Sequence, residues 1–297
     1  MASLKEIKGR IASVSGTLKI TSAMKLVASA KLRKAQQAVG NMLPYERQLH
    51  RILTGLMAAC QGAPVFPVPE PVEGAEKPAR RVSIVAFASN SSLCGAFNSN
   101  AVKLVLSAIN EYRAAGLRDE DIVVYSVGRK MQDAMRKAGF TSPADYSRLV
   151  DSPGYDGAAG LAQTIIDEFH AGRTGKVELI FNHYKSTASQ VPTRETYLPF
   201  SIGPSASECS ALFPDDVIVE PSPEAVLEDL IPKVLRLKIY TVLLDSVAAE
   251  HAARTVAMQT ATDNGNDLLE ELTLEYNKGR QQKITSEILD IVGGSMQ

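Results

Sequence analysis

Cys94 is the side chain in this sequence with the clearest capacity for nucleophilic chemistry, because it lies in SNSSLCGAFN close to the start of an expected helix. A helix N-terminus lowers the pKa of a thiol and favours the nucleophilic thiolate. The sequence offers no adjacent histidine to serve as a base, so we interpret Cys94 as a small packed thiol. The same segment matches neither G-x-G-x-x-G nor a Walker A loop, and it therefore lacks a phosphate cradle.

Residue types that bind metals or form disulfides are also poorly arranged for those roles. The histidines and cysteines are His50, His170, His183, His251, Cys60, Cys94 and Cys209. No two histidines have the i, i+4 spacing of a helical zinc site, and three scattered cysteines suit neither a disulfide framework nor a zinc site. There is no G-x-S-x-G elbow and no convincing carboxylate pair. We therefore expect no catalytic residue, no metal and no cofactor, and a reducing compartment.

The overall charge excludes a bulk electrostatic attraction to nucleic acid or to an anionic membrane. The 32 basic and 33 acidic residues give a formal net charge of -1. The start, MASLKEIKGR, has no apolar signal region, and no uninterrupted apolar stretch is long enough to span a bilayer. These features predict a cytoplasmic protein, or one held at a membrane only through partners.

Residues 1–40 are locally very basic, with Glu6 as their single acidic residue. The basic residues there are Lys5, Lys8, Arg10, Lys19, Lys25, Lys31, Arg33 and Lys34. A basic helix that also carries an apolar seam suits an acidic protein surface or a phosphate backbone. Because aromatic residues are scarce in this segment, nucleic acid is a minor alternative.

Two long helices must position these charges, one at each end of the chain. In residues 1–60 the apolar positions Leu4, Ile7, Ile11, Val14 and Leu18 alternate steps of three and four, which is a coiled-coil seam. Residues 224–297 hold a second long apolar stripe and a single proline. Two such helices are expected to pack as a long antiparallel coiled coil.

The middle of the chain predicts a Rossmann-like α/β domain over residues 81–203. Runs rich in β-branched residues at 82–89, 121–128 and 177–184 predict buried strands, with helices between them at 98–115, 129–138 and 158–171. The run 194–200 is expected to pair antiparallel with 177–184 at an edge. A proline-rich connection, 61–80, precedes the domain, and a connecting loop, 204–223, follows it.

Both ends of the chain resemble the gamma subunit family of F-type ATP synthases. The resemblance rests on LKEIKGRIASVSGTLKITSAMKLVASAKLRKAQ (4–36), on EHAARTVAMQTATDNGNDLLEELTLEYNKGRQQKITSEILDIVGG (250–294), and on LCG (93–95) with Asn98. The chain departs from the family pattern in its long proline-rich segment and at Thr255, where the family often has methionine. It also has Asn90, Ser91 and Ser92 where the family usually has a charged residue and a glycine.

The resemblance implies a rotor shaft without a catalytic site. Such a shaft turns inside a ring of alpha and beta subunits and couples ion flow through the membrane c-ring to ATP synthesis or hydrolysis. Its implied partners are the alpha, beta and epsilon subunits and the c-ring, with one copy per complex, no homo-oligomer and no nucleic acid. The implied location is peripheral, on the cytoplasmic face of the bacterial plasma membrane.

The resemblance also implies partner-binding residues on the two helices. Four residues match its RQ-x-x-x-T-x-E pattern, namely Arg280, Gln281, Thr285 and Glu287. The resemblance implies that they bind a beta-subunit loop, and we call them the catch. The apolar end, implied to sit in a hydrophobic sleeve, comprises Ile284, Ile288, Leu289, Ile291 and Val292. Met24 and Lys25 are implied to pass a carboxylate-rich beta-subunit loop, and Arg254 also belongs to this partner-binding set.

Two other functional classes are compatible with the residues alone. An oxidoreductase-like or transferase enzyme with a helical dimerisation arm would need a cofactor loop. A coiled-coil scaffold or nucleic-acid-binding protein would form a free-standing homodimer. Co-purification with ATP synthase alpha, beta and epsilon subunits would distinguish the rotor from both.

Overall fold

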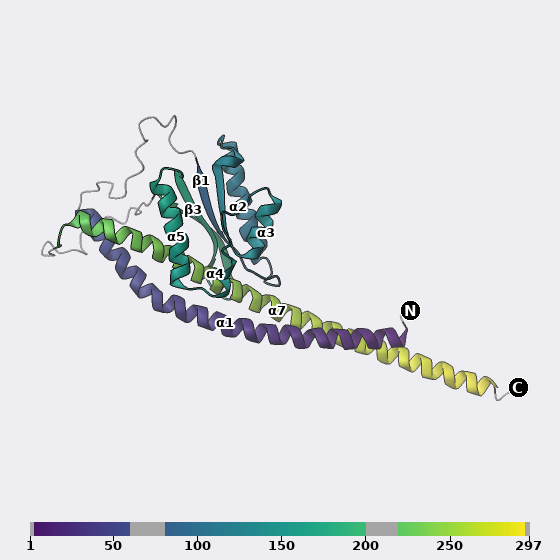
Figure 1. Cartoon of the computed structure of the whole chain (residues 1–297). Helices are drawn as coiled ribbons and strands as arrows, with labels where there is room; N and C mark the ends of the chain where they lie inside the picture. The colour runs from purple at the N-terminus through teal and green to yellow at the C-terminus, as the bar shows by residue number, and fades with distance from the viewer. Residues whose placement is uncertain (1–2, 60–80, 200–218, 295–297) are drawn as a thin grey trace.

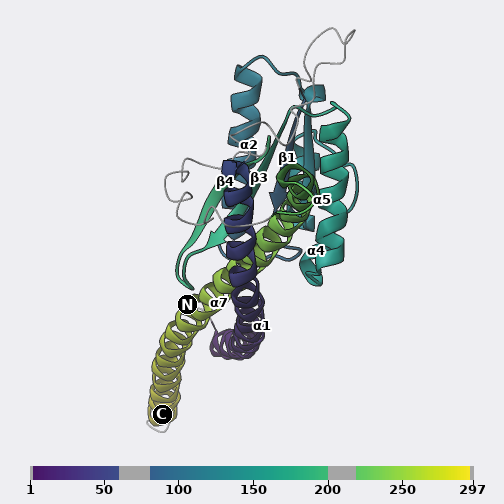
Figure 2. The same ribbon diagram turned by 90° about the vertical axis from the view of Figure 1, so that its left-hand side faces the viewer.

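Two long helices dominate the structure, a computed structural model that describes residues 3–59, 81–199 and 219–294. Helix α1 (Leu4–Ala59) has 56 residues and helix α7 (Pro223–Gly294) has 72. They run antiparallel, side by side, with the α/β domain attached to one side of the pair (Figure 1, Figure 2). At 1.5 Å per residue, α7 reaches roughly 110 Å. The predicted antiparallel pair of terminal helices is confirmed.

Small residues bring the two helices together at regular intervals. A Cβ atom on Gly265 would lie 2.7 Å from Leu18 Cδ2, and one on Gly279 would lie 3.0 Å from Leu4 Cδ2. The two leucines are two heptads apart, and so are the two glycines. Each leucine therefore fills a space that the facing glycine leaves open. The seam predicted from the N-terminal apolar positions is the one that makes these contacts.

The α/β domain is built on a four-stranded sheet of order β2-β1-β3-β4. Its strands are β1 (Val82–Phe87), β2 (Ile122–Val127), β3 (Lys176–Tyr184) and β4 (Gln190–Leu198). β1 pairs parallel with β2 and β3, whereas β4 pairs antiparallel with β3 at the edge. The three predicted strands and the predicted antiparallel edge pairing are thus confirmed.

Four helices and one 3-10 turn connect these strands. They are α2 (Phe97–Ala114), η1 (Asp119–Asp121), α3 (Arg129–Lys137), α4 (Ser147–Asp151) and α5 (Tyr155–His170). α2, α3 and α5 agree closely with the predicted ranges. The prediction missed α4 and η1, because segments of five and three residues are too short to show a helical period.

Side chains on β1 alternate between two cores. Ile84 and Ala86 pack with α2 and α3 on one face, whereas Val85 and Phe87 face the core that includes α5 and α7. Leu243 of α7 belongs to this second core and is 1% exposed. The coiled coil and the α/β domain therefore share one hydrophobic core along the first half of α7.

Some sequence predictions fall outside the described residues. These are the proline-rich connection 61–80, most of the connecting loop 204–223, and the thiols Cys60 and Cys209. Among the described residues, no helix combines the length and the apolar character that crossing a membrane requires.

Candidate partner-binding surface

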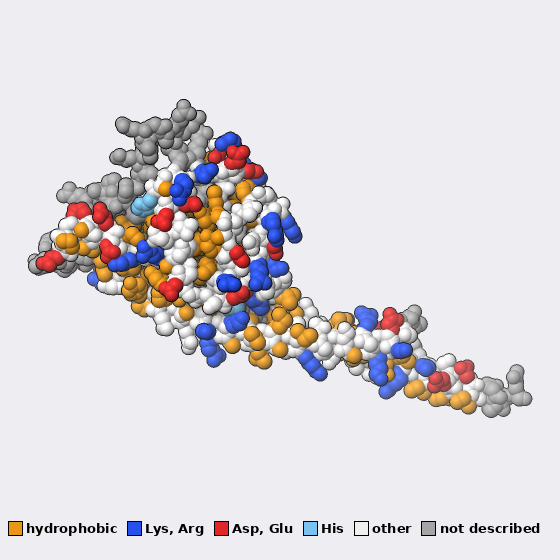
Figure 3. Space-filling model, in the orientation of Figure 1, with side chains coloured by type: hydrophobic (Ala, Val, Ile, Leu, Met, Phe, Trp, Pro, Cys, Tyr) orange, Lys and Arg blue, Asp and Glu red, His pale blue; other side chains and the backbone are white. Residues whose placement is uncertain are grey.

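The last described turns of α7 extend beyond the start of α1 (Figure 1). Leu4 lies against Gly279, and every side chain from Arg280 to Val292, a segment we call the tip, is exposed. Its apolar members are Ile284, Ile288, Leu289, Ile291 and Val292, with exposed fractions between 47% and 72%. Figure 3 shows hydrophobic side chains along this projecting end. In the described part of the chain, these residues therefore do not pack against α1.

The polar residues of the predicted catch lie on the same exposed segment. Thr285 Oγ1 donates to the carbonyl oxygen of Gln281 at 2.9 Å, a contact within the helix. Lys283 and Glu287 form an exposed ion pair of 3.6 Å. Arg280 has an exposed side chain at the base of the tip. The structure thus brings Arg280, Gln281, Thr285 and Glu287 together on one exposed stretch of helix, and their binding role stays a prediction.

Near the middle of α1, Met24 and Lys25 are half-buried. Beside them lie three strongly exposed apolar side chains, Ile20 at 61%, Leu26 at 71% and Val27 at 57%. No sequence motif assigned these three residues to a site. The seven-residue spacing of Ile20 and Val27 places both on one helical face, and this spacing was the available signal.

Arg254 is placed differently from the other predicted residues, because it is 9% exposed and used internally. Its guanidinium pairs with Glu250 one helical turn away. Nη2 donates to Ser91 Oγ at 2.8 Å and approaches the carbonyl oxygens of Ser91 and Ser92 at 3.4 Å. Its predicted role toward a partner stays a prediction, whereas its contacts here join α7 to the loop after β1.

In open α/β sheets, ligands bind beyond the carboxyl ends of the parallel strands. Here α7 covers that edge. Cys94 and Phe97, which follow β1, are buried in one cluster with Ala249 and Ala253 of α7. Cys94 is 1% exposed and accepts a contact of 3.2 Å from Asn98 Nδ2, as expected for a packed thiol. α7 thus occupies the position beyond β1 where a ligand binds in other open α/β sheets.

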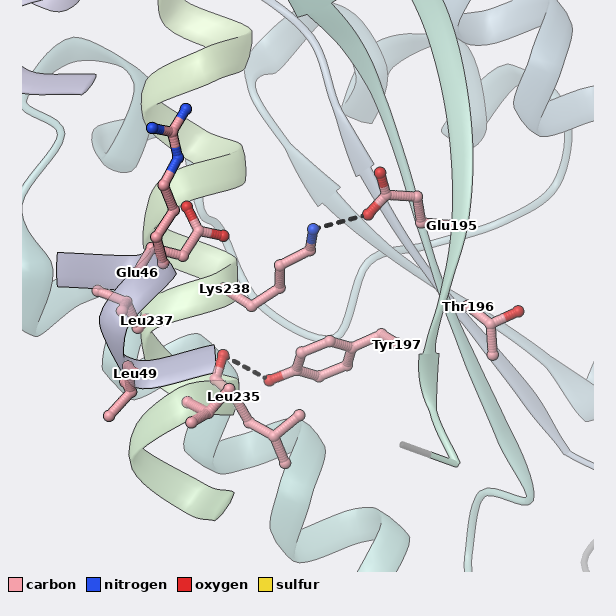
Figure 4. A pocket seen from close by; sticks show the side chains of 10 residues that line it. Glu46, Leu49, Glu195, Thr196, Tyr197, Leu235, Leu237 and Lys238 are labelled. Carbon is pink, nitrogen blue, oxygen red and sulfur yellow. Dashed lines mark hydrogen bonds and ion pairs between the residues drawn. The ribbon is translucent and has the colours of Figure 1, made fainter. Parts of the chain in front are cut away.

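A cleft of about 420 Å³ opens between α1, β4 and α7 (Figure 4). Three of its polar side chains, Lys238, Glu195 and Tyr197, are paired with groups of the cleft wall. Lys238 Nζ on α7 lies 2.8 Å from Glu195 Oε2 on β4, and Tyr197 Oη donates to the carbonyl oxygen of Leu235 at 3.0 Å. These contacts tie the edge strand to α7. The arrangement joins two elements and presents no convergent set of catalytic groups.

Two titratable groups, the half-buried His251 and the buried Glu250, lie where α7 meets α1 and the domain. Burial lowers the pKa of His251 to about 4, and the positive charges of Arg254 and Lys31 act in the same direction. Burial raises the pKa of Glu250, which the neighbouring Arg254 opposes. His251 Nδ1 has no hydrogen-bond partner within the described part of the chain. In that same part, no group of three or more His, Cys, Asp or Glu side chains is arranged to hold a metal ion.

An extended coiled coil that shares a core with a small α/β domain and ends in an exposed apolar tip defines a stalk-like structural subunit. A family model described as ATP synthase matches residues 3–296. The ATP synthase gamma chain of Phocaeicola vulgatus is 53% identical over 296 residues, and that of Bacteroides fragilis is 52% identical over 297, with all of both chains covered in each case. This chain belongs to the family of ATP synthase gamma chains.

Solved structures show the same fold at lower identity. A chain from the mitochondrial ATP synthase of Euglena gracilis is 18% identical with a TM-score of 0.61, and the match covers 99% of this chain and 93% of that one. A chain from the central stalk and c-ring structure of the Tetrahymena thermophila enzyme is 22% identical with a TM-score of 0.56, covering 82% and 99%. As a gamma chain, the protein is a stalk subunit that has no catalytic site of its own.

Proposed function

We propose that this chain is the rotating central shaft that couples ion flow through a membrane c-ring to ATP synthesis or hydrolysis in a ring of alpha and beta subunits. The observation that carries the proposal is the tip, an exposed single helix bearing five apolar side chains. An exposed apolar surface of this kind in a soluble protein marks an interaction site. A hydrophobic sleeve formed by the alpha and beta subunits would cover it while allowing it to turn.

The catch residues supply the polar part of this interaction. A planar guanidinium binds a carboxylate through two parallel hydrogen bonds, so Arg280 suits a carboxylate-bearing loop of a beta subunit. Gln281 lies beside it and offers amide donors, while Thr285 and Glu287 extend the polar surface by one to two turns. A grip on one beta conformation and not on the others favours that conformation, which is how a shaft biases catalysis without a site of its own.

The middle of α1 forms a second contact surface. Met24 and Lys25 lie beside the exposed side chains of Ile20, Leu26 and Val27. Apolar contact next to a cationic side chain fits a beta-subunit loop that is rich in carboxylates. In this arrangement, Met24→Lys adds an ion pair and lowers coupling while ATP hydrolysis continues. Unchanged ion pumping per ATP hydrolysed in that variant would contradict this part of the proposal.

The opposite end of the coiled coil and the α/β domain face the membrane side of the complex. There the c-ring and the epsilon subunit bind, so the chain is peripheral on the cytoplasmic face of the bacterial plasma membrane. One copy per complex follows from a shaft that occupies the axis of a ring. Co-purification from native membranes with the alpha, beta and epsilon subunits tests this set of partners, and a free homodimer would contradict it.

The catch is tested in assembled complexes that carry Arg280→Ala together with Gln281→Ala. Loss of a buried charged contact costs about 2 to 5 kcal/mol, so turnover of ATP is expected to change more than tenfold. Lys278→Ala is a matched control, because Lys278 is an exposed cation less than one turn away. Intact assembly with turnover, coupling and torque at the wild-type level would show that these residues are ordinary surface groups.

A further inference from the structure

Several polar contacts join the α/β domain to α7, among them Lys238 with Glu195 and Arg236 with Gln163. Two others, which we call the attachment points, lie where the parallel strands β1 and β3 end. One involves Asp245 and the other Arg254, both on α7. They are nine residues apart, which corresponds to about 13 Å along the helix axis. The shared hydrophobic core holds the domain on α7, and two separated directional contacts at the strand ends add resistance to tilting about it.

The first attachment point binds the loop after β1, residues 89–95, which we call the β1 loop. Arg254 Nη2 donates to Ser91 Oγ at 2.8 Å, and the Arg254 side chain is held in place by the buried carboxylate of Glu250. Arg254 and Glu250 are 9% and 5% exposed, so the donor side of this contact is shielded from water, whereas Ser91 itself is exposed.

The second attachment point binds the end of β3. Asp245 Oδ1 accepts from the backbone N–H of Tyr184 at 3.0 Å, and Oδ2 lies 2.7 Å from Nδ1 of His183. The Asp245 side chain is 16% exposed. Asp245 therefore accepts from the backbone N–H of Tyr184 at the end of β3. Without this acceptor, burial of the unpaired N–H would cost free energy.

The β1 loop also adopts a backbone conformation that needs support. Leu93 has a φ of 67°, which is unusual for a branched residue, and its side chain is 58% exposed. Such a conformation persists only where the surroundings hold it. Asn98 and Ser89 hydrogen-bond at the start of the loop, and Arg254 binds its middle. The loop is thus clamped against α7 in a conformation that it would not favour by itself.

We propose that these two attachment points, Ser91 with Arg254 and Tyr184 with Asp245, make the α/β domain and α7 turn as one body. The inference rests on the proposed rotor function, because a rigid attachment matters mechanically when torque enters through the domain and leaves through the helix. Ser91 and Asp245 are positioning residues in this scheme. They act by preventing the domain from tilting on the helix.

Amide hydrogen exchange on the full-length chain tests the first point directly. Ser91→Ala removes the acceptor of one charge-assisted hydrogen bond, so amides of residues 93–98 are expected to exchange about tenfold faster. Ser91→Thr keeps the hydroxyl and should restore slow exchange. Ser92→Ala is the matched control, because Ser92 contributes only its backbone carbonyl. Wild-type exchange in Ser91→Ala would overturn the first attachment point.

The mechanical consequence is measured in the assembled complex. A bead is fixed to the α/β domain, the beta subunits are immobilised, and torsional stiffness is read from the angular fluctuations of the bead. Ser91→Ala combined with Asp245→Ala is expected to lose stiffness, whereas Ser92→Ala should not. Wild-type stiffness in the double variant would overturn the inference. Failure of the unmodified chain to assemble with alpha and beta subunits would instead count against the proposed function, and the exchange result would still decide the attachment.

Discussion

Both ends of α7 carry apolar side chains, but these side chains have opposite surroundings. Between Leu227 and Met258 most of its apolar side chains are buried against α1, α5 and the sheet, whereas from Arg280 to Val292 every side chain is exposed. The first half is stabilised by the chain itself. The tip has apolar residues for which the chain supplies no facing surface in its described part. One helix thus serves as part of a core at one end and as a surface for partners at the other.

The largest expected difference between the two ends concerns stability. Leu243→Ala empties a fully buried site and should lower the free energy of unfolding by about 2 to 5 kcal/mol. Ile288→Ala, at a site that is 55% exposed, should change it by less than about 0.5 kcal/mol. Urea unfolding of the isolated chain, followed by circular dichroism, measures both. Equal losses would mean that the tip packs internally in solution.

The buried half should also respond to pH through His251. Its pKa is about 4 in the folded chain, against 6.5 for an unperturbed histidine, so the unfolded chain binds more protons between these values. Stability should therefore fall as the pH drops from 6.5 toward 4, by up to about 3 kcal/mol. His251→Asn should remove most of this loss. The pKa of Glu250 is raised in the folded chain, so its contribution to stability falls as the pH rises above 4.5. Glu250 is present both in the wild type and in His251→Asn.

The control for this pH effect lies in the tip. Glu287→Gln removes an exposed carboxylate whose only described pairing is the 3.6 Å contact with Lys283. The unfolding free energy of the Glu287→Gln variant should depend on pH in the same way as that of the wild type. If His251→Asn also follows the wild-type profile, His251 is accessible to protons in the folded chain, and the buried half is looser than the structure indicates.

Glycines distinguish the packed part of the coiled coil from its open face. Gly265→Ala places a Cβ atom 2.7 Å from Leu18 Cδ2, and should destabilise the chain by about 1 kcal/mol despite the better helix propensity of alanine. Gly16→Ala meets nothing within 4 Å and should stabilise by about 0.5 to 1 kcal/mol. Thermal unfolding of both variants gives the sign. Stabilisation by both substitutions would show that the helices separate readily at Leu18.

The sequence predicted the fold well where the signal was long or strongly patterned. The seam that begins at Leu4 and Ile7 predicted α1, and β-branched runs predicted three strands, because each pattern repeats over many residues. It could not predict that Arg254 is buried, since its acceptor Ser91 is 163 positions away along the chain. A basic side chain on a helix ordinarily suggests an exposed position.

The candidate site was predicted in part for a related reason. The resemblance supplied the identity of the tip residues, yet their exposure depends on how far α7 extends beyond Leu4. That offset follows from the register of the coiled coil, in which Leu18 faces Gly265. Apolar periodicity is the same whether a seam faces α1 or a partner, so it could not distinguish packing of Ile288 against the first helix from exposure.

The smallest expected effect comes from shortening the tip. A chain that ends after Ser286 loses Ile288, Leu289 and Ile291 but no described contact with α1 or the domain, so its unfolding free energy should stay within about 0.5 kcal/mol of wild type. In assembled complexes the same truncation should weaken torque, because the surface for the sleeve is reduced. A chain that ends after Leu268 is the contrasting variant. It removes Leu272, which is 3% exposed, and uncovers Ile7, so its stability should fall by about 2 kcal/mol or more. An unfolded α/β domain in the chain that ends after Ser286 would contradict the view that the tip binds partners and that the rest of the chain folds without it.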